Sequence, residues 1–376
     1  MKISNLRLIN KKSLSIIFAI GMVFIPINSA HADNKTIQLP SIVTNNKTND
    51  SKDSFYIGFP KNTKKTHLLS NDVVMQMMEK KRITPYYLPY NNYPNYTIII
   101  NGETYTYRPN DNSFISGKGN IKCRFYATSD NLDEIDNVIT IIGGTGSRNR
   151  GEDLSNVPLS SNAIIVVCYS GNSDINMIDN ANTVAECTKF ADYVFLKNPD
   201  KICNSIIGTS EGAQTAFVTV ANNPGVYQSF VCSNGSAYYD KGRINLIGKF
   251  SNSSSYKNFD NMEIIFLESK NNNHWNQSII QKLHDLKDHG VSMDNIIFCT
   301  NDREFIRPIK YVIGEDNFYF LNDAESIKYG NWSKHGDGMN MIINSNVLSY
   351  LSDASHTNDY ERENNCIYEN YGRAKK

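Results

Sequence analysis

The sequence of 376 residues lacks several features that mark large classes of protein. Lysine and arginine total 38, and aspartate and glutamate also total 38, so the formal net charge is zero. A balanced charge gives no bulk attraction to nucleic acid or to an anionic membrane. Beyond the N-terminal run, no segment is apolar enough to cross a bilayer, which takes about 20 residues. We therefore expect no nucleic-acid partner and no membrane span in the mature chain.

Two further absences bear on cofactors. The seven cysteines include no C-x-x-C pair, which argues against a structural zinc site. The glycine-rich residues 143–146 are followed by Ser147-Arg148-Asn149, where a phosphate-binding loop would have Gly-Lys-Ser/Thr. They also miss the G-x-G-x-x-G spacing of a dinucleotide site. We expect no metal ion and no organic cofactor.

The cysteine count is odd, so at least one thiol is unpaired within a monomer. Cys168, Cys232 and Cys299 lie in apolar runs and are candidates for small buried core residues.

The first 32 residues have the layout of a secretory signal peptide. Four basic side chains precede an apolar run over residues 14–27, and Ala30 and Ala32 then form an A-x-A cleavage site. The run is shorter than an ordinary membrane span, although an uncleaved anchor is the alternative. We predict cleavage after Ala32 and a secreted or extracytoplasmic protein that begins near Asp33.

The composition changes along the chain and suggests four parts. Residues 1–32 form the signal peptide, and residues 33–95 form a polar, proline-broken extension. Residues 96–352 carry the regular pattern of a folded domain, and residues 353–376 form a charged tail. A polar insertion at residues 251–256 is short, so any cap over a site should be small.

Short apolar runs separated by helix-like stretches begin at residue 96. The first two runs flank an Asn-Gly pair that is typical of a hairpin. The runs are residues 96–100, 103–107, 121–127, 138–142, 163–168, 205–207, 229–232, 262–267 and 295–299, and helix-like stretches cover residues 182–195, 277–289 and 339–348. A further helix pattern starts after Ser210 and meets no helix breaker until Pro224. Continuous apolar strands indicate a parallel sheet whose two faces are covered. We predict an α/β fold with a mostly parallel central sheet, helices on both faces and antiparallel strands at its start.

One stretch joins a strand pattern to a helix pattern through Gly208-Thr209-Ser210-Glu211-Gly212, a G-x-S-x-G sequence. In a nucleophile elbow the serine has a strained backbone that lifts its hydroxyl above the sheet. A Cβ at either glycine would crowd the neighbouring strand or helix. We predict Ser210 as the nucleophile. The alternative is a passive turn serine.

With the glycine-rich turn at residues 143–146, this elbow and a late His335-Gly336, residues 96–352 resemble the α/β-hydrolase family. The resemblance implies an esterase-like serine hydrolase with the order serine, acid, histidine. One departure is Gly143-Gly144, where many members have His-Gly. That histidine is usually structural, so its absence leaves the expected chemistry in place.

The resemblance also suggests the base and the acid. His335 lies in a glycine-rich loop after the last core strand, where the family places its base, and His356 in the tail is its competitor. Glu268 follows the strand at residues 262–267 and is the expected acid, although aspartate is commoner there. Asp302, after the strand at residues 295–299, is the alternative acid.

An oxyanion hole needs two backbone N–H groups aimed at the developing charge. We expect one from Glu211, directly after the nucleophile at a helix start. The other should come from the turn at residues 143–146, with Thr145 suggested by the resemblance.

These features together predict a secreted serine hydrolase that cleaves a carboxylic ester or related acyl bond in a small-molecule, glycan or lipid ester. A thioesterase, a peptidase or an acyltransferase would use the same triad. A non-catalytic surface or binding protein that keeps the hydrolase scaffold is the alternative from another class.

Overall fold

The computed structural model describes residues 63–100, 103–116, 119–128, 132–172, 177–197, 204–235, 256–260, 262–270, 276–345, 347–352 and 368–370. The predicted signal peptide, His356 and most of the predicted polar insertion and charged tail lie outside these residues.

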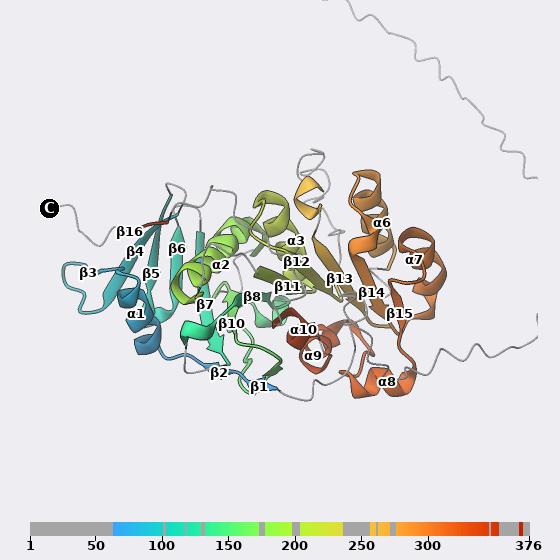
Figure 1. The fold of residues 1–376 in the computed structure, drawn as a ribbon, viewed down its shortest axis with the longest axis horizontal. Coiled ribbons are helices and arrows are strands. Elements are labelled where there is room, and N and C mark those ends of the chain that lie inside the picture. Colours follow the sequence, from blue (N-terminus) through green and yellow to red (C-terminus); the bar gives the residue numbers. More distant parts are fainter. Residues whose placement is uncertain are drawn as a thin grey trace, which may run out of the picture. The chain divides into compact units, whose positions relative to one another are not determined.

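The described strands form a 14-stranded sheet and a separate two-stranded pair (Figure 1). The large sheet runs in the order β15-β14-β13-β12-β11-β8-β10-β7-β6-β5-β4-β16, with β2 paired to β7 and β3 paired to β4, while β1 pairs with β9. The bounds are β1 Lys64–Lys65, β2 His67–Leu68, β3 Pro85–Tyr87, β4 Pro94–Ile100, β5 Glu103–Arg108, β6 Ser113–Ser116, β7 Gly119–Ala127, β8 Asn137–Ile142, β9 Pro158–Leu159, β10 Ala163–Tyr169, β11 Asn204–Thr209, β12 Ser229–Ser233, β13 Glu263–Glu268, β14 Ile296–Thr300, β15 Phe318–Phe320 and β16 Tyr368–Asn370.

The strands from β15 to β10 in this order are parallel to one another, and those from β7 to β16 are antiparallel to their neighbours. The antiparallel half comes first in the sequence, apart from β16. The elbow serine follows β11, which lies inside the parallel half. The structure therefore confirms the α/β-hydrolase fold that the sequence predicts, including its antiparallel start.

Helices cover both faces of the sheet. Their bounds are α1 Asn71–Lys80, α2 Ala181–Phe195, α3 Glu211–Asn222, α6 Asn276–Asp288, α7 Ile306–Ile313, α8 Asp323–Lys328, α9 Gly338–Asn344 and α10 Val347–Ser352. Apolar side chains of α2, α3, α6 and α7 join one core cluster, and those of α9 and α10 join a second cluster on the opposite face (Figure 1). None of these helices is long and apolar enough to cross a membrane, within the part of the chain that the structure describes.

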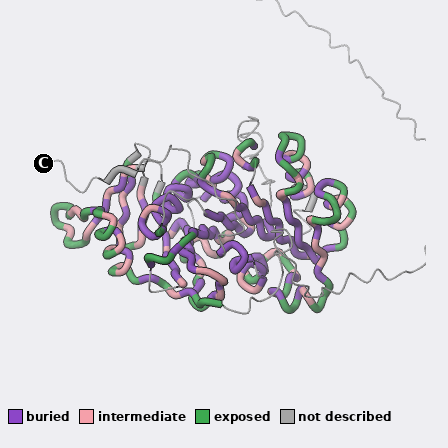
Figure 2. Tube along the Cα trace, viewed as in Figure 1, coloured by how far each residue is buried: buried purple, intermediate pink, exposed green. Residues whose placement is uncertain are grey.

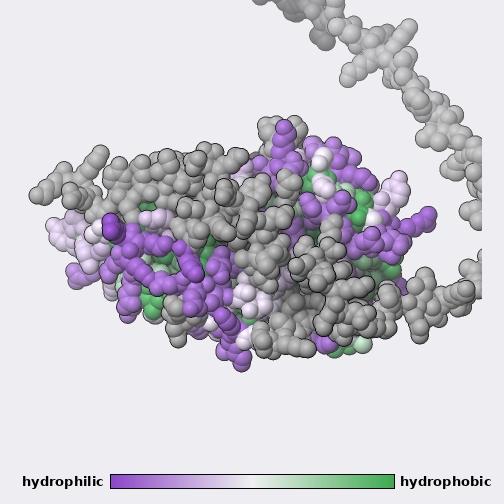
Figure 3. Space-filling model, viewed as in Figure 1, coloured by the Kyte–Doolittle hydropathy of each residue, from purple (hydrophilic) through white to green (hydrophobic). Residues whose placement is uncertain are grey.

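The central strands are mainly apolar because side chains on both faces of the sheet are buried. Along β10, Ile164 and Val166 face the cluster under α2 and α3, while Ile165 and Val167 face the cluster under α9 and α10. Figure 2 shows the central strands buried along their length and the exposed residues on the outer turns. The visible described surface is largely hydrophilic, with smaller hydrophobic areas between the polar ones (Figure 3).

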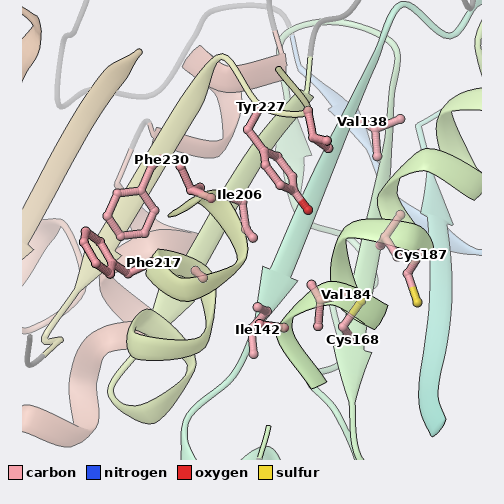
Figure 4. Close-up of a cluster of buried hydrophobic side chains, with 14 of the residues drawn as sticks. Val138, Ile142, Cys168, Val184, Cys187, Ile206, Phe217, Tyr227 and Phe230 are labelled. Carbon is pink, nitrogen blue, oxygen red and sulfur yellow. The ribbon is translucent and has the colours of Figure 1, made fainter. Parts of the chain in front are cut away.

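The first cluster is built mainly from aliphatic, aromatic and thiol side chains. Figure 4 shows it between the strands and helices that flank the elbow, with labelled members Val138, Ile142, Cys168, Val184, Cys187, Ile206, Phe217, Tyr227 and Phe230. Cys168, Cys232 and Cys299 are free and buried, which confirms the prediction that they are core residues. The strand and the helix on either side of Ser210 therefore pack into a closely packed core.

Several local predictions are confirmed. Ile100 pairs with Glu103 across a two-residue connection, as expected of the hairpin, although the Asn-Gly turn itself lies outside the described residues. The predicted helices at residues 182–195 and 277–289 are α2 and α6.

The predicted closing helix at residues 339–348 was wrong in one respect. The chain forms two helices, α9 and α10, because Ser345 is extended, with φ −81° and ψ 168°, and ends the first. Strands β6, β15 and β16 were not predicted from the sequence. Strands β2, β3 and β16 pair with β7 and β4, so residues from the predicted extension and tail contribute to the large sheet.

Candidate active site

Ser210 occupies the sharp turn between β11 and α3. Its φ is 52° and its ψ is −119°, a region that residues with a side chain rarely adopt. The Ser210 N–H donates to the carbonyl oxygen of Ser233 at 3.2 Å, which ties the turn to the end of β12. Its side chain is only partly buried. The hydroxyl is thus held by a strained backbone at the carboxyl edge of the parallel strands, as in a nucleophile elbow.

Both glycines of the elbow are sterically required. A Cβ on Gly208 would lie 2.3 Å from the carbonyl oxygen of Gly212, at the start of α3. A Cβ on Gly212 would lie 2.2 Å from the carbonyl oxygen of Ile142, at the end of β8. Both distances are well below any real contact of a Cβ atom. The predicted crowding is confirmed, with the helix as the neighbour of Gly208 and the strand as the neighbour of Gly212.

His335 lies against Ser210 although the two residues are 125 positions apart in the sequence. Its Nε2 is 2.7 Å from Ser210 Oγ, within the range for proton transfer to a general base. His335 begins the short turn η9, His335–Asp337, directly before α9. Burial lowers the pKa of His335 below its usual 6.5, because water is lost around the charged form. The imidazole is therefore mainly neutral at pH 7, the form that accepts a proton from serine.

The two candidate acids differ in their surroundings. Glu268 ends β13 and is fully buried, and Cys232 Sγ donates to its Oε1 at 3.9 Å. Burial, and after it the charge of Glu268, raises the pKa of Cys232. Asp302 caps the short helix η8, Arg303–Phe305, where its Oδ1 accepts from the N–H of Glu304 at 2.9 Å. The orienting role toward His335 stays a prediction for either carboxylate.

The expected oxyanion turn lies directly beside the nucleophile. A Cβ on Gly144 would be 3.1 Å from Ser210 Cβ, and Thr145 begins the short turn η4, Thr145–Ser147. Thr145 Oγ1 donates to Glu211 Oε2 at 2.9 Å. The N–H of Glu211 is the first of α3, and such groups find no acceptor within their own helix. The structure therefore brings Thr145 and Glu211 together beside Ser210, with a helix N-terminus facing the site.

Glu211 also forms an ion pair with Arg148. The side chains are only 16% and 13% exposed, for Arg148 and Glu211 respectively. This pair joins the residue after the nucleophile to Arg148, the residue that follows η4. Nothing in the sequence spacing of Arg148 and Glu211 indicates this contact, so it was not predicted.

Two further residues of the site were missed. Asp337 Oδ2 accepts from the N–H and Oγ of Ser333 and from the N–H of Lys334, at 2.8 to 3.1 Å, which closes the loop that carries His335. Ser233 Oγ donates to the carbonyl oxygen of Gly338 at 2.9 Å. Ser233 ends β12 and Asp337 ends η9, and polar residues at such positions are too common to single these two out.

The described residues contain no group of three or more histidine, cysteine, aspartate or glutamate side chains that could hold a metal ion. The absence of a cofactor stays an expectation from the sequence.

Comparison with family models and with curated proteins finds no match for this chain. Among solved structures, it is similar to a thermostable esterase, with 12% identity, a TM-score of 0.41, and coverage of 71% of this chain and 75% of that one. It is also similar to an esterase of Pyrobaculum calidifontis, with 11% identity, a TM-score of 0.34, and coverage of 74% and 90%. A third similar structure is a dienelactone hydrolase-like promiscuous phosphotriesterase from metagenomic libraries. It has 8% identity, a TM-score of 0.36, and coverage of 57% of this chain and 91% of that one. Likenesses this weak say nothing by themselves about the activity of this chain.

Proposed function

We propose that this chain, which has the α/β-hydrolase fold, is a serine hydrolase that cleaves a carboxylic ester or a related acyl bond. The observation that carries the proposal is the 2.7 Å distance between Ser210 Oγ and His335 Nε2 at a strained elbow. A serine hydroxyl is a weak nucleophile unless a base within hydrogen-bond reach takes its proton. A scaffold that only binds would have no need for this pairing or for the strained backbone.

In the proposed reaction, Ser210 Oγ attacks the carbonyl carbon of the substrate while His335 Nε2 takes the hydroxyl proton. The resulting oxyanion accepts hydrogen bonds from the N–H groups of Glu211 and Thr145, where the start of α3 adds favourable electrostatics. His335 then gives its proton to the leaving oxygen, and an acyl-enzyme remains. Water, deprotonated by His335, then attacks the acyl carbon. The bond to Ser210 Oγ breaks, His335 returns the proton to Oγ, and the carboxylic acid leaves.

Glu268 is the proposed acid that orients the imidazole and stabilises its charged form, with Asp302 as the alternative. Glu268 is supported by its place at the carboxyl end of β13, two strands from β11 in the sheet. The carboxylate of Asp302 already caps η8, which makes Asp302 the weaker candidate for the acid.

The proposed setting is outside the cytoplasm, on the strength of the signal-peptide pattern in residues 1–32. The proposed substrate is a small-molecule, glycan or lipid ester. Thioester, amide and acyl-transfer chemistry would use the same residues, so a panel of acyl donors, with and without an added alcohol acceptor, separates these activities.

The decisive experiment is covalent labelling of the secreted protein with a fluorophosphonate probe, together with hydrolysis of p-nitrophenyl acetate. We expect labelling and turnover in the wild-type protein and neither in Ser210→Ala. Ser292→Ala is the matched control, because Ser292 is exposed and its side chain makes no capping bond. If the wild-type protein resists the probe, or if Ser210→Ala keeps its rate, the proposed function is wrong and a binding scaffold is favoured.

A further inference from the structure

Two asparagines stand one residue beyond the ends of two strands that flank β13. Asn234 follows β12, and Asn301 follows β14. Asn234 is fully buried, and Asn301 is 7% exposed. A buried amide side chain must find partners for its donors and its acceptor, because leaving either unpaired is costly. Each asparagine accepts from the loop after β13 and donates to the loop that carries His335.

Asn234 connects the end of β13 to the histidine itself. Its Oδ1 accepts from the N–H and the Oγ of Ser269, at 2.8 and 2.9 Å. Its Nδ2 donates to the backbone carbonyl oxygens of Lys334 and His335, both at 3.1 Å. The oxygen accepts twice, and Nδ2, which also lies 3.3 Å from Met341 Sδ, donates to both carbonyl oxygens. The side chain therefore links three segments of the chain at the point where His335 meets Ser210.

The backbone of Asn234 fits this task. Its φ is 44°, in the left-handed region that asparagine tolerates better than most residues. Its N–H donates to the carbonyl oxygen of Leu267 at 2.8 Å, within β13. The neighbouring Ser233 is bonded to the elbow through Ser210 N–H. Asn234 is thus fixed to the same framework that fixes the nucleophile.

Asn301 makes the equivalent connection at a different place in the loop. Its Oδ1 accepts from the N–H of Lys270 at 2.7 Å, and its Nδ2 donates to the carbonyl oxygen of Trp332 at 2.5 Å. The chemistry and the burial resemble those of Asn234, but the carbonyl it holds lies three residues before His335. Substitutions of Asn301 are therefore a matched control for substitutions of Asn234.

We propose that Asn234 is the positioning residue of His335, whose side-chain amide holds the histidine backbone to the ends of β12 and β13 and so sets the imidazole against Ser210. This role of Asn234 in catalysis rests on the proposed hydrolase function. An amide is required because the same side chain must accept from an N–H and donate to carbonyl oxygens. Leucine would fill the space without either bond, and aspartate could only accept.

The test compares Asn234→Asp with Asn301→Asp. Each change keeps the acceptor toward the loop after β13 and replaces the donors toward the histidine loop with a carboxylate that repels the carbonyl oxygens. We expect Asn234→Asp to lower the rate of fluorophosphonate labelling and kcat by about 10- to 100-fold, with KM nearly unchanged, because misplacement of a catalytic group slows chemistry. We expect Asn301→Asp to lose a similar amount of thermal stability while the rates fall less than about threefold.

Equal rate losses in the two variants, or an unchanged kcat in folded Asn234→Asp, would overturn the proposal in favour of a purely structural role. The pair Asn234→Gly and Asn301→Gly covers a failure of the aspartate variants to fold, since glycine accepts the positive φ at position 234 and adds no charge.

A direct readout does not depend on activity. Crystal structures of the two glycine variants should show the distance from Ser210 Oγ to His335 Nε2 lengthened beyond hydrogen-bond range in Asn234→Gly and kept in Asn301→Gly. An unchanged distance in Asn234→Gly would end the proposal even if the wild-type protein proves to have no hydrolase activity. Failure of wild-type labelling would instead count against the proposed function alone.

Discussion

Gly212 lies so close to Ile142 that a Cβ on the glycine would be 2.2 Å from the carbonyl oxygen of Ile142. The contact joins the first turn of α3 to the end of β8, and β8 leads directly into the oxyanion turn. The helix that carries Glu211 and the turn that carries Thr145 are therefore held together at van der Waals distance. The geometry proposed for oxyanion binding depends on the absence of a single methyl group.

Gly212→Ala should disrupt this contact, because the atoms it would strike are backbone atoms that cannot rotate away. We expect a loss of about 1–3 kcal/mol in the free energy of unfolding, with fluorophosphonate labelling reduced in the protein that remains folded. Gly146→Ala is the control for stability, since a Cβ there has nothing within 4 Å. Denaturant unfolding measures both variants. Equal stability of the two would contradict the steric account.

The pH dependence of the rate should follow the neutral form of His335. Burial lowers its pKa below 6.5, so the proton-accepting form persists to more acidic pH than an ordinary histidine allows. The profile of kcat/KM should be flat near pH 7 and fall as the pH drops through an inflection below 6.5. Circular dichroism over the same range separates this inflection from acid unfolding. An inflection above 6.5 would show that a carboxylate near the imidazole outweighs desolvation.

Glu268→Gln and Asp302→Asn should behave differently. Removing the charge that orients the imidazole costs serine hydrolases up to about 10⁴-fold in kcat, and we expect a loss of at least about 100-fold in Glu268→Gln. Asp302→Asn keeps an oxygen to cap η8, so its rate and melting temperature should stay near those of the wild-type protein. Steady-state kinetics on p-nitrophenyl acetate compares them. The reverse order would assign the acid to Asp302.

The ion pair between Arg148 and Glu211 should show energetic coupling. Both side chains are mostly buried, and Glu211 also accepts from Thr145 Oγ1. In a double-mutant cycle with Arg148→Met and Glu211→Gln, we expect a coupling energy of about 1–3 kcal/mol in unfolding, because either single change leaves a buried charge without its partner. The rates of labelling should fall in both single variants. Additive effects would show that the pair does not hold the turn.

The parts of this fold that sequence patterns predicted are those where one local cause decides the outcome. The central strands are mainly apolar because both faces of the sheet are covered. The elbow is marked because two backbone contacts exclude any residue but glycine. Strands β6, β15 and β16 were not predicted because they are short, and they form strands only through pairing with their neighbours in the sheet. The division of the closing helix depends on the extended Ser345, which no spacing rule marks.

The sequence by itself determined the elbow around Ser210, the order of the candidate residues and the α/β class, because these follow from local sterics and from the burial of short segments. Only the tertiary structure decided that His335 meets Ser210, and that Asn234, Asp337 and Arg148 hold the surrounding loops. The contacts of Asp337 are local. The others join segments far apart in the chain, and each uses an ordinary polar residue. These residues meet because the carboxyl ends of the parallel strands lie at one edge of the sheet, where the loops that carry the residues begin.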